Sequence, residues 1–225
     1  MHDRIGAACA QAGRDVQSIT LLNVSKTFSA DAVREAAAAG EHRFGENYVA
    51  EGIAKIAALA DLREGIEWHL IGPLQSNKTR VVAEAFDWVH SVDRLKIAQR
   101  LSEQRPAQRP ALQVCLQIII SGEASTSGLA PAEARDIAHA VAALPHLRLR
   151  GLMAIPEPAD TLDAQRAPHR ALHDLMRTLQ ADGLPLATLS IGMSADLEAA
   201  ILEGATMVRI GSAIFGGRPP LRQAG

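Results

Sequence analysis

Residues 188–212 read TLSIGMSADLEAAILEGATMVRIGS, and this stretch decides the fold. It divides into a β-type run at Thr188–Ile191, a helical pattern at Ala195–Leu202 with Ser194 as its expected cap, and a second β-type run at Met207–Ile210. Two strands joined by one helix are expected to pair in parallel through a right-handed crossover. The stretch is therefore one βαβ unit of an α/β fold.

The same alternation continues through the rest of the chain. Further strands are predicted at Ile19–Val24, Arg43–Phe44, Trp68–Ile71, Trp88–Val92, Leu112–Ile120 and Leu149–Ile155. Helices are predicted at Ala30–Ala39, Asn47–Leu62, Asn77–Ala85, Arg94–Glu103, Pro131–Leu144 and Asp163–Ala181. Eight strands in 225 residues favour a single (β/α)₈ TIM-type barrel as one domain over residues 1–225. An open doubly wound sheet is the alternative, although no dinucleotide fingerprint follows the first strand.

Composition excludes several classes of function. The net charge is −2 and 21% of the residues are charged, so a broadly basic nucleic-acid surface is excluded. No apolar run approaches the ~18 residues of a membrane span, and the N-terminus lacks the apolar stretch of a secretory signal. The two cysteines, Cys9 and Cys115, cannot form a disulfide framework, and no His/Cys/Asp/Glu cluster has metal-ligand spacing. We therefore expect a cytoplasmic protein with no membrane, nucleic-acid or metal partner.

Chemistry that needs a lysine amine has four candidates, Lys26, Lys55, Lys78 and Lys96. Lys55 and Lys96 fall in helical patterns and are expected on solvated faces, whereas Lys78 lies near a helix start. Lys26 ends an apolar strand, and the active groups of a parallel barrel gather at such ends. Burial there would lower the pKa of the amine, and a neutral amine can form a Schiff base with an aldehyde. The alternative is a strand-end lysine paired with a carboxylate.

The last two strand ends add a candidate phosphate site and an arginine. Gly192-Met193-Ser194 and Gly211-Ser212 each place a glycine and a hydroxyl where a helix is expected to begin, and such places bind phosphate. Arg209 alternates with Val208 and Ile210, so an inward Arg209 must meet an acceptor, such as a carboxylate or an aromatic ring nitrogen. An aldehyde-binding lysine, a phosphate cradle and an arginine that can face a pyridine together describe a pyridoxal 5′-phosphate site.

The histidines carry less functional information. His69 is flanked by Trp68 and Leu70 in a predicted strand, and we expect it to be a hydrogen-bonded core residue. His169 and His173 share one face of a predicted helix, four residues apart. Without an HExxH context, that face is expected to be solvated.

Five motifs of the chain are similar to those of a known family. They are VSKT at 24–27, FGENYV at 44–49, EWHLIGPLQSNKTR at 67–80, RLRGLMAIP at 148–156 and SIGMSADLEAAILEGATMVRIGSAIFG at 190–216. In this order they resemble the pyridoxal phosphate homeostasis protein family (YggS/PROSC type), from about Ile19 to Gly217. The resemblance implies a single barrel like the N-terminal domain of fold-type III enzymes such as alanine racemase. It also implies that the protein buffers and delivers pyridoxal phosphate.

The resemblance assigns cofactor binding to seven positions of this chain, namely Lys26, Asn47, Met153, Ser194, Arg209, Gly211 and Ser212. Lys26 would carry the Schiff base, Arg209 would approach the pyridine nitrogen, and the serine and glycine positions would hold the phosphate. Asn47 would lie near the cofactor ring, and Met153 would line the pocket.

Two departures from the family pattern affect these expectations. The family commonly has asparagine where Ile119 stands and lysine where Thr126 stands, and that lysine is linked with secondary cofactor handling. Little sequence precedes Gly13, so a shortened first helix is expected.

The resemblance predicts a carrier without turnover and not an enzyme. Alanine racemases take the base opposite the lysine from a tyrosine of a separate domain in the partner subunit, whereas the only tyrosine here is Tyr48. A slow alanine-racemase-like enzyme and a barrel that binds a different phosphorylated ligand are the alternatives. The absent dimerising domain predicts a monomer, and apo forms of pyridoxal phosphate enzymes are the candidate recipients of the cofactor.

Overall fold

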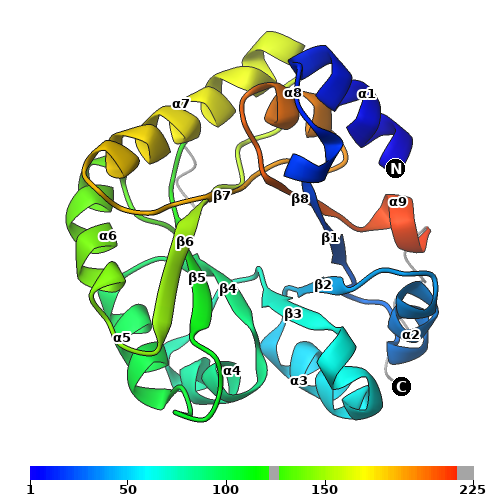
Figure 1. The fold of residues 1–225 in the computed structure, drawn as a ribbon, viewed down its shortest axis with the longest axis vertical. Coiled ribbons are helices and arrows are strands. Elements are labelled where there is room, and N and C mark those ends of the chain that lie inside the picture. The colour runs from blue at the N-terminus through cyan, green and yellow to red at the C-terminus, as the bar shows by residue number, and fades with distance from the viewer. Residues whose placement is uncertain (122–126, 217–225) are drawn as a thin grey trace, which may run out of the picture.

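Eight parallel strands close into a barrel (Figure 1). The computed structural model describes residues 1–121 and 127–216, without the side chain of Ser212, so Thr126 lies outside the described residues. The strands follow chain order around the barrel and are β1 (Thr20–Val24), β2 (Arg43–Glu46), β3 (Glu67–Leu70), β4 (Trp88–Val92), β5 (Leu112–Gln117), β6 (Leu147–Met153), β7 (Thr188–Ser190) and β8 (Met207–Ile210). The predicted (β/α)₈ barrel is confirmed, and the open doubly wound sheet is wrong.

Helices surround the barrel and connect its strands. They are α1 (His2–Ala12), α2 (Ala30–Ala38), α3 (Val49–Ala58), α4 (Thr79–Ala85), α5 (Leu95–Gln104), α6 (Ala134–Ala142), α7 (Leu162–Ala181), α8 (Leu197–Leu202) and α9 (Ser212–Phe215). Short 3₁₀ turns occur at Val16–Ser18, Ala60–Gly65, Ser76–Lys78 and Pro131–Glu133. No helix in the described part of the chain is long and apolar enough to cross a membrane.

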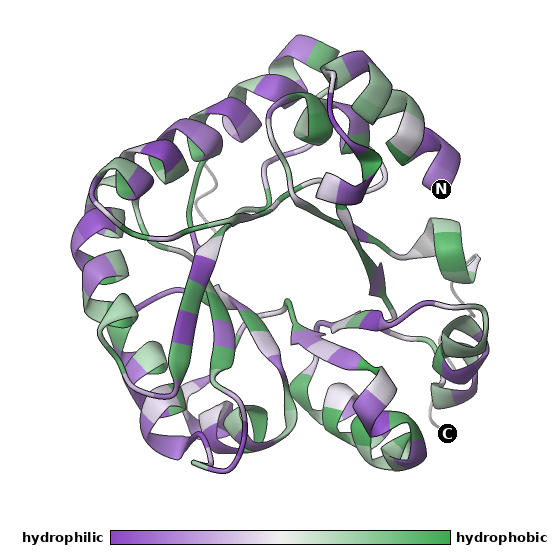
Figure 2. Ribbon diagram, viewed as in Figure 1, coloured by the Kyte–Doolittle hydropathy of each residue, from purple (hydrophilic) through white to green (hydrophobic). Residues whose placement is uncertain are grey.

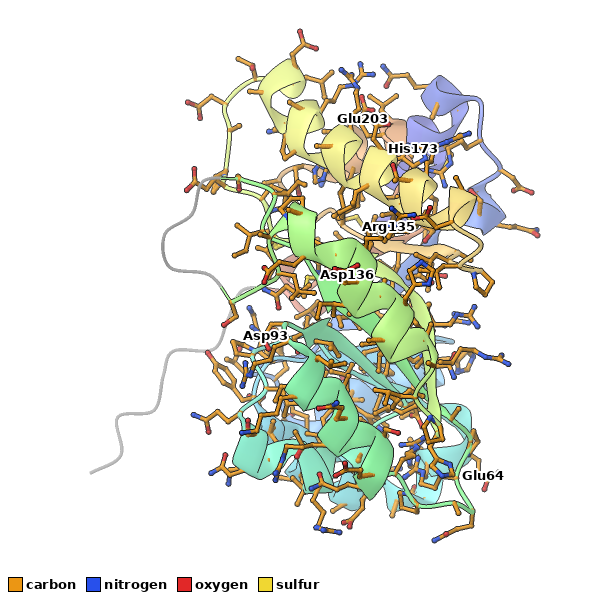
Figure 3. All side chains as sticks on the ribbon, turned by 90° about the vertical axis from the view of Figure 1, so that its left-hand side faces the viewer. Glu64, Asp93, Arg135, Asp136, His173 and Glu203 are labelled. Carbon is orange, nitrogen blue, oxygen red and sulfur yellow. The ribbon has the colours of Figure 1, made fainter. Side chains whose placement is uncertain are left out.

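Helices α5, α6 and α7 are amphipathic, and each buries one face in the core. Figure 2 shows hydrophilic residues along the outer sides of the helices, and Figure 3 shows Arg135 and Asp136 of α6 on the outer side. The main core lies between the strands and the helices, where Phe44, Trp68 and Phe86 are fully buried. Removing this apolar surface from water is the main stabilising contribution to the fold.

Barrel closure brings the first and last strands together. β1 pairs with β8, so that Leu22 lies opposite Arg209 and Asn23 lies opposite Ile210. A Cβ on Gly211 would come within 3.1 Å of the Val24 carbonyl oxygen, so the two strand ends approach closely. The segment that carries Lys26 therefore begins beside the segment that carries Gly211.

Several local predictions were wrong. The helix predicted from residue 195 begins at Leu197 with Asp196 at its N-cap position, so Ser194 is not its cap. Lys55 is only 5% exposed and is not on a solvated face. His169 is likewise buried, whereas His173 on the same helix is partly exposed. The short α9 was not predicted, and the first helix has 11 residues and packs against α8.

Candidate functional site

A cavity of about 520 Å³ lies at the carboxyl ends of the strands, and we call it the C-terminal cavity. Its walls come from the ends of β1, β2, β3, β6, β7 and β8. It is lined by Val24, Lys26, Phe28, Asn47, Ile71, Ile155, Met193, Ser194, Ala195, Arg209 and Gly211. Five of the seven residues expected to bind a cofactor thus meet in one cavity, although they are far apart in the sequence.

Of the two remaining positions, Met153 is not among the described lining residues, and the Ser212 side chain is not described. Met153 is fully buried and clusters with Trp88 and Cys115, and the lining residue from this strand end is Ile155 instead. Ser212 is the first residue of α9, directly after Gly211, but its side chain lies outside what the structure describes.

Lys26 occupies a strained turn after β1. Thr27 has φ 70°, a left-handed conformation that is unusual for a β-branched residue and costs about 1–3 kcal/mol. The Thr27 N–H donates to Glu51 Oε1 at 2.6 Å, which ties the turn to α3. Strain of this kind persists only where the surroundings hold it, so the backbone of Lys26 has a defined position.

A buried cluster of charged residues next to the turn stabilises its strained backbone conformation. Lys55 Nζ donates to the Ser25 carbonyl at 2.6 Å, to Glu46 Oε1 at 2.8 Å and to Glu51 Oε1 at 2.7 Å. The Ser25 hydroxyl also donates to Glu46 at 2.5 Å. Burial raises the pKa of Glu46, whereas the charge and hydrogen bond of Lys55 oppose that rise. The backbone on both sides of Lys26 is therefore anchored to one buried ammonium.

Asn47 is positioned by the loops after β2 and β3. A Cβ on Gly72 would overlap the Asn47 carbonyl group, so only glycine permits this approach. Gly72 in turn accepts, through its carbonyl oxygen, a hydrogen bond of 2.6 Å from the Ser91 hydroxyl. Asn47 is thereby placed at the cavity wall with its side chain partly exposed.

Arg209 is a buried cation of this cavity, with 5% of its surface exposed. Its Nη1 donates to the Ser190 carbonyl and, at 2.9 Å, to the Ser190 hydroxyl, while Nη2 donates to the Ala154 carbonyl at 2.9 Å. Burial lowers the pKa of Arg209 to about 10, which leaves it charged at neutral pH. Within residues 1–121 and 127–216 no carboxylate forms an ion pair with it, and three of its five N–H hydrogens have acceptors.

The loop after β7 is held from two sides. Asp196 accepts a hydrogen bond of 2.7 Å from the Met193 N–H, and its other oxygen lies 2.9 Å from His169 Nε2. Arg4 of α1 donates to the Ser194 carbonyl at 3.0 Å from outside the barrel. Gly192 has φ 94°, and a Cβ there would lie 2.6 Å from the Ala200 side chain. These contacts determine where Ser194 enters the cavity.

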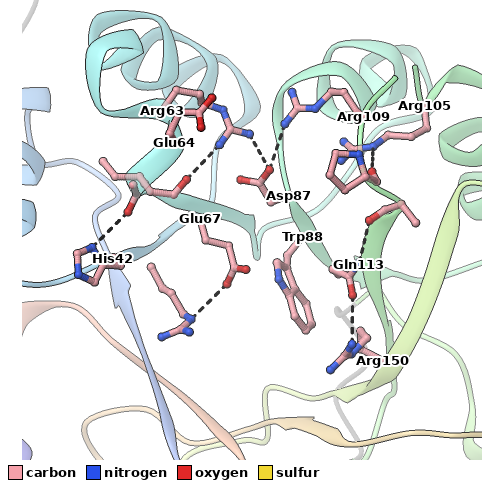
Figure 4. A pocket seen from close by; sticks show the side chains of 15 residues that line it. His42, Arg63, Glu64, Glu67, Asp87, Trp88, Arg105, Arg109, Gln113 and Arg150 are labelled. Carbon is pink, nitrogen blue, oxygen red and sulfur yellow. Dashed lines mark hydrogen bonds and ion pairs between the residues drawn. The ribbon is translucent and has the colours of Figure 1, made fainter. Parts of the chain in front are cut away.

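A larger cavity of about 780 Å³ lies at the opposite end of the barrel, and we call it the N-terminal cavity. Figure 4 shows its charged lining, in which Arg63 and Arg109 both contact Asp87. Glu67 and Trp88 also line it. It contains none of the seven predicted residues, and the end of a parallel barrel where it opens is not where active groups gather.

Comparisons with known proteins show which family the chain belongs to. The family model of the alanine racemase N-terminal domain matches residues 3–219. The pyridoxal phosphate homeostasis protein of Pseudomonas aeruginosa is 61% identical over 215 residues, which cover 96% of this chain and 91% of that protein. The structure of PipY from Synechococcus elongatus PCC7942 with PLP bound has a TM-score of 0.83 and 39% identity, over 94% of this chain and all of that one.

A more distant solved structure shares the fold alone. Alanine racemase of Clostridium difficile 630 has a TM-score of 0.70 and 16% identity, and the match covers this whole chain but 58% of the racemase.

Proposed function

This chain belongs to the pyridoxal phosphate homeostasis proteins, within the alanine racemase N-terminal domain family, and from that premise we propose that it binds pyridoxal 5′-phosphate in the C-terminal cavity. The observation that carries the proposal is the meeting of Lys26, Arg209, Ser194 and Gly211 in one cavity of about 520 Å³. Small-molecule sites commonly measure about 300–1,000 Å³. Bound pyridoxal phosphate supplies an aldehyde, which the Lys26 amine can hold as a Schiff base with loss of water.

The other functional groups of the cofactor also have counterparts in the chain. Arg209 is buried and charged, and it retains N–H donors that a ring nitrogen can accept. Ser194 and Gly211, with Ser212 beside it, supply the hydroxyl and backbone groups proposed for the phosphate. Asn47 would face the ring from the β2 side. Met153 stays a prediction, since it packs with Trp88 and Cys115 and is not among the described residues that line the cavity.

We propose a carrier and not a racemase, because the described residues that line the C-terminal cavity include no acid or base that could act opposite Lys26. Lys26 and Arg209 are the only ionisable side chains among the described lining residues, and a racemase needs a proton-transfer group on each face of its substrate. Tyr48 is 59% exposed at the start of α3 and is not among those lining residues. The proposed role is to bind free pyridoxal phosphate in the cytoplasm and release it to apoenzymes.

The decisive experiment locates the covalent adduct. The purified protein is incubated with pyridoxal phosphate, reduced with borohydride, digested and analysed by mass spectrometry. We expect the reduced adduct on Lys26, and Lys26→Ala should lose both the adduct and the yellow colour. Lys96→Ala, which changes an exposed lysine on α5, is the matched control and should retain both. An adduct on another lysine would refute the assignment, and robust racemisation of amino acids by the loaded protein would refute the carrier role.

A further inference from the structure

Hydrogen bonds connect Arg209 with the opposite end of the barrel. Arg209 Nη1 donates to Ser190 Oγ at 2.9 Å, and Ser190 Oγ lies 2.7 Å from His90 Nδ1. His90 Nε2 lies 2.9 Å from His69 Nδ1, and His69 Nε2 lies 2.9 Å from Glu67 Oε1. β4 and β7 are not neighbours in the sheet, so the bond between His90 and Ser190 crosses the barrel interior. We call these five side chains the axial chain.

The axial chain joins the two cavities. Arg209 lines the C-terminal cavity, whereas Glu67 lines the N-terminal cavity, where Figure 4 shows it near Trp88. The three links between them, Ser190, His90 and His69, are fully buried. His69 also stacks on Trp88, with ring centroids 5.2 Å apart. Buried polar groups are costly unless every one is paired, and here each link has a partner on both sides.

The protonation states of its members favour one direction of donation. Burial lowers the pKa of His69 and lowers the pKa of His90 well below its usual value, where neighbouring His69 and Arg209 add to the effect. Both imidazoles are therefore neutral at pH 7. Burial raises the pKa of Glu67, but the combined influence of His69, Trp88 and Arg43 outweighs burial, and the pKa falls to about 2. Glu67 is thus an acceptor only.

These states assign every hydrogen in the axial chain. His69 donates from Nε2 to Glu67, so its Nδ1 must accept from His90 Nε2. The Nδ1 of His90 then accepts from the Ser190 hydroxyl. Because the Ser190 hydroxyl donates its proton to His90, the Ser190 oxygen can only accept the hydrogen bond from Arg209. The Ser190 hydroxyl, together with the carbonyl oxygens of Ser190 and Ala154, therefore sets the orientation of the guanidinium.

We propose that Ser190 and His90 are positioning residues for Arg209, and that the axial chain aims its guanidinium at the ring nitrogen of the bound cofactor. The inference rests on the proposed function, because it requires pyridoxal phosphate in the C-terminal cavity. Neither residue is among those that line that cavity, so both act through Arg209. If Ser190 and His90 act only by positioning Arg209, replacing either one should weaken recognition of the ring nitrogen and leave the other contacts of the cofactor unchanged.

The test compares two ligands on the full chain. One is pyridoxal 5′-phosphate, and the other is the analogue with carbon in place of the ring nitrogen. We expect Ser190→Ala to weaken binding of pyridoxal phosphate about tenfold, the scale of one hydrogen bond, and to leave binding of the analogue unchanged. Ser190→Thr retains the hydroxyl and should recover most of the loss. The matched control is Ser102→Ala, which removes a buried hydroxyl that donates to the Pro145 carbonyl outside the axial chain, and it should bind both ligands normally.

The far end of the axial chain provides a second test that does not depend on a buried substitution. The Glu67 side chain is 39% exposed, so Glu67→Ala should fold. We expect it to weaken pyridoxal phosphate binding about two- to threefold without affecting the analogue, whereas Glu67→Gln, which keeps an acceptor, should resemble the wild type.

Each outcome separates the inference from the proposed function. If the wild type forms no adduct on Lys26, the proposed function fails. If the adduct forms but Ser190→Ala binds pyridoxal phosphate like the wild type, or loses both ligands equally, the positioning role is overturned. Should Ser190→Ala fail to fold, equal binding of pyridoxal phosphate by Glu67→Ala and the wild type overturns it as well.

Discussion

Lys55 is the residue on which the geometry around Lys26 depends most. Its ammonium joins Glu46, Glu51 and the Ser25 carbonyl, and both Lys55 and Glu46 are buried. Lys55→Met leaves the Glu46 carboxylate without its cation, and breaking a buried ion pair in this way costs about 3–5 kcal/mol. We expect a corresponding fall in the free energy of unfolding, measured by urea denaturation.

Two further variants separate this effect from a general loss of charge. Lys96→Met changes an exposed lysine and should unfold at the same urea concentration as the wild type. The double variant Glu46→Gln/Lys55→Met removes both charges and should recover part of the lost stability. Equal stability of Lys55→Met and Lys96→Met would contradict the role of the cluster.

Single residues were predictable where their position along a strand decides their surroundings. Lys26 and Arg209 were found in this way, because a strand end and an alternating register place them at the barrel mouth. The burial of Lys55 was not predicted, because it depends on the contact with Glu46 at the end of the preceding strand. The spacing of Glu51 and Lys55, four residues apart on one helix, was the available signal.

Among the elements, α1 supports the cavity from outside the barrel. Arg4 binds Glu198 of α8 through two hydrogen bonds of 2.9 and 2.8 Å, and it also binds the Ser194 carbonyl. Because the pair is exposed, Arg4→Ala should change stability by less than about 1 kcal/mol. Because Ser194 lines the cavity, the same change should weaken pyridoxal phosphate binding about two- to threefold, a fraction of a kcal/mol, measured by absorbance titration.

The chain contains a matched control for this change. Arg34 and Asp61 form a similarly exposed bidentate pair at 2.6 and 2.9 Å, and neither residue lines the C-terminal cavity. Arg34→Ala should therefore bind pyridoxal phosphate like the wild type. A loss of affinity in both variants, or in neither, would show that α1 does not hold the Ser194 loop.

The positions of the elements were predictable to within a few residues, but their ends were not. Short β-type runs between helical patterns predicted all eight strands, because strands covered by helices are rich in apolar residues. The start of α8 was misplaced because the side chain of Asp196 binds the Met193 N–H, so residues 193–195 stay in a loop. Helix dipole arguments for Ser194 therefore do not apply, and its proposed role rests on its place in the cavity wall.

In the whole molecule, the barrel followed from counting strand–helix units, whereas its interior could not be predicted. The axial chain joins His90 to Ser190 across 100 residues of sequence. No local pattern indicates which inward side chains meet inside a closed barrel, because that depends on register and stagger. The expectation that His69 is a hydrogen-bonded core residue is confirmed, but its partners came only from the structure.

The buried histidines of the axial chain make the stability of the whole molecule depend on pH. Burial lowers the pKa of His69 and of His90, so the folded protein resists protonating them, whereas the unfolded chain takes up protons below about pH 6.5. Above that pH both states hold neutral imidazoles and nothing changes. Below it the free energy of unfolding should fall, by at most about 1.4 kcal/mol per histidine for each pH unit. Thermal melts between pH 7.5 and 5.5 should therefore show Tm decreasing by about 2–4 °C per kcal/mol lost.

Two variants test whether the axial histidines cause this pH dependence. His90→Gln removes one of the two buried imidazoles and should make the slope of Tm against pH shallower. His139→Gln changes an exposed histidine and should leave the slope as in the wild type. Parallel slopes in all three proteins would mean that the axial histidines are not held neutral.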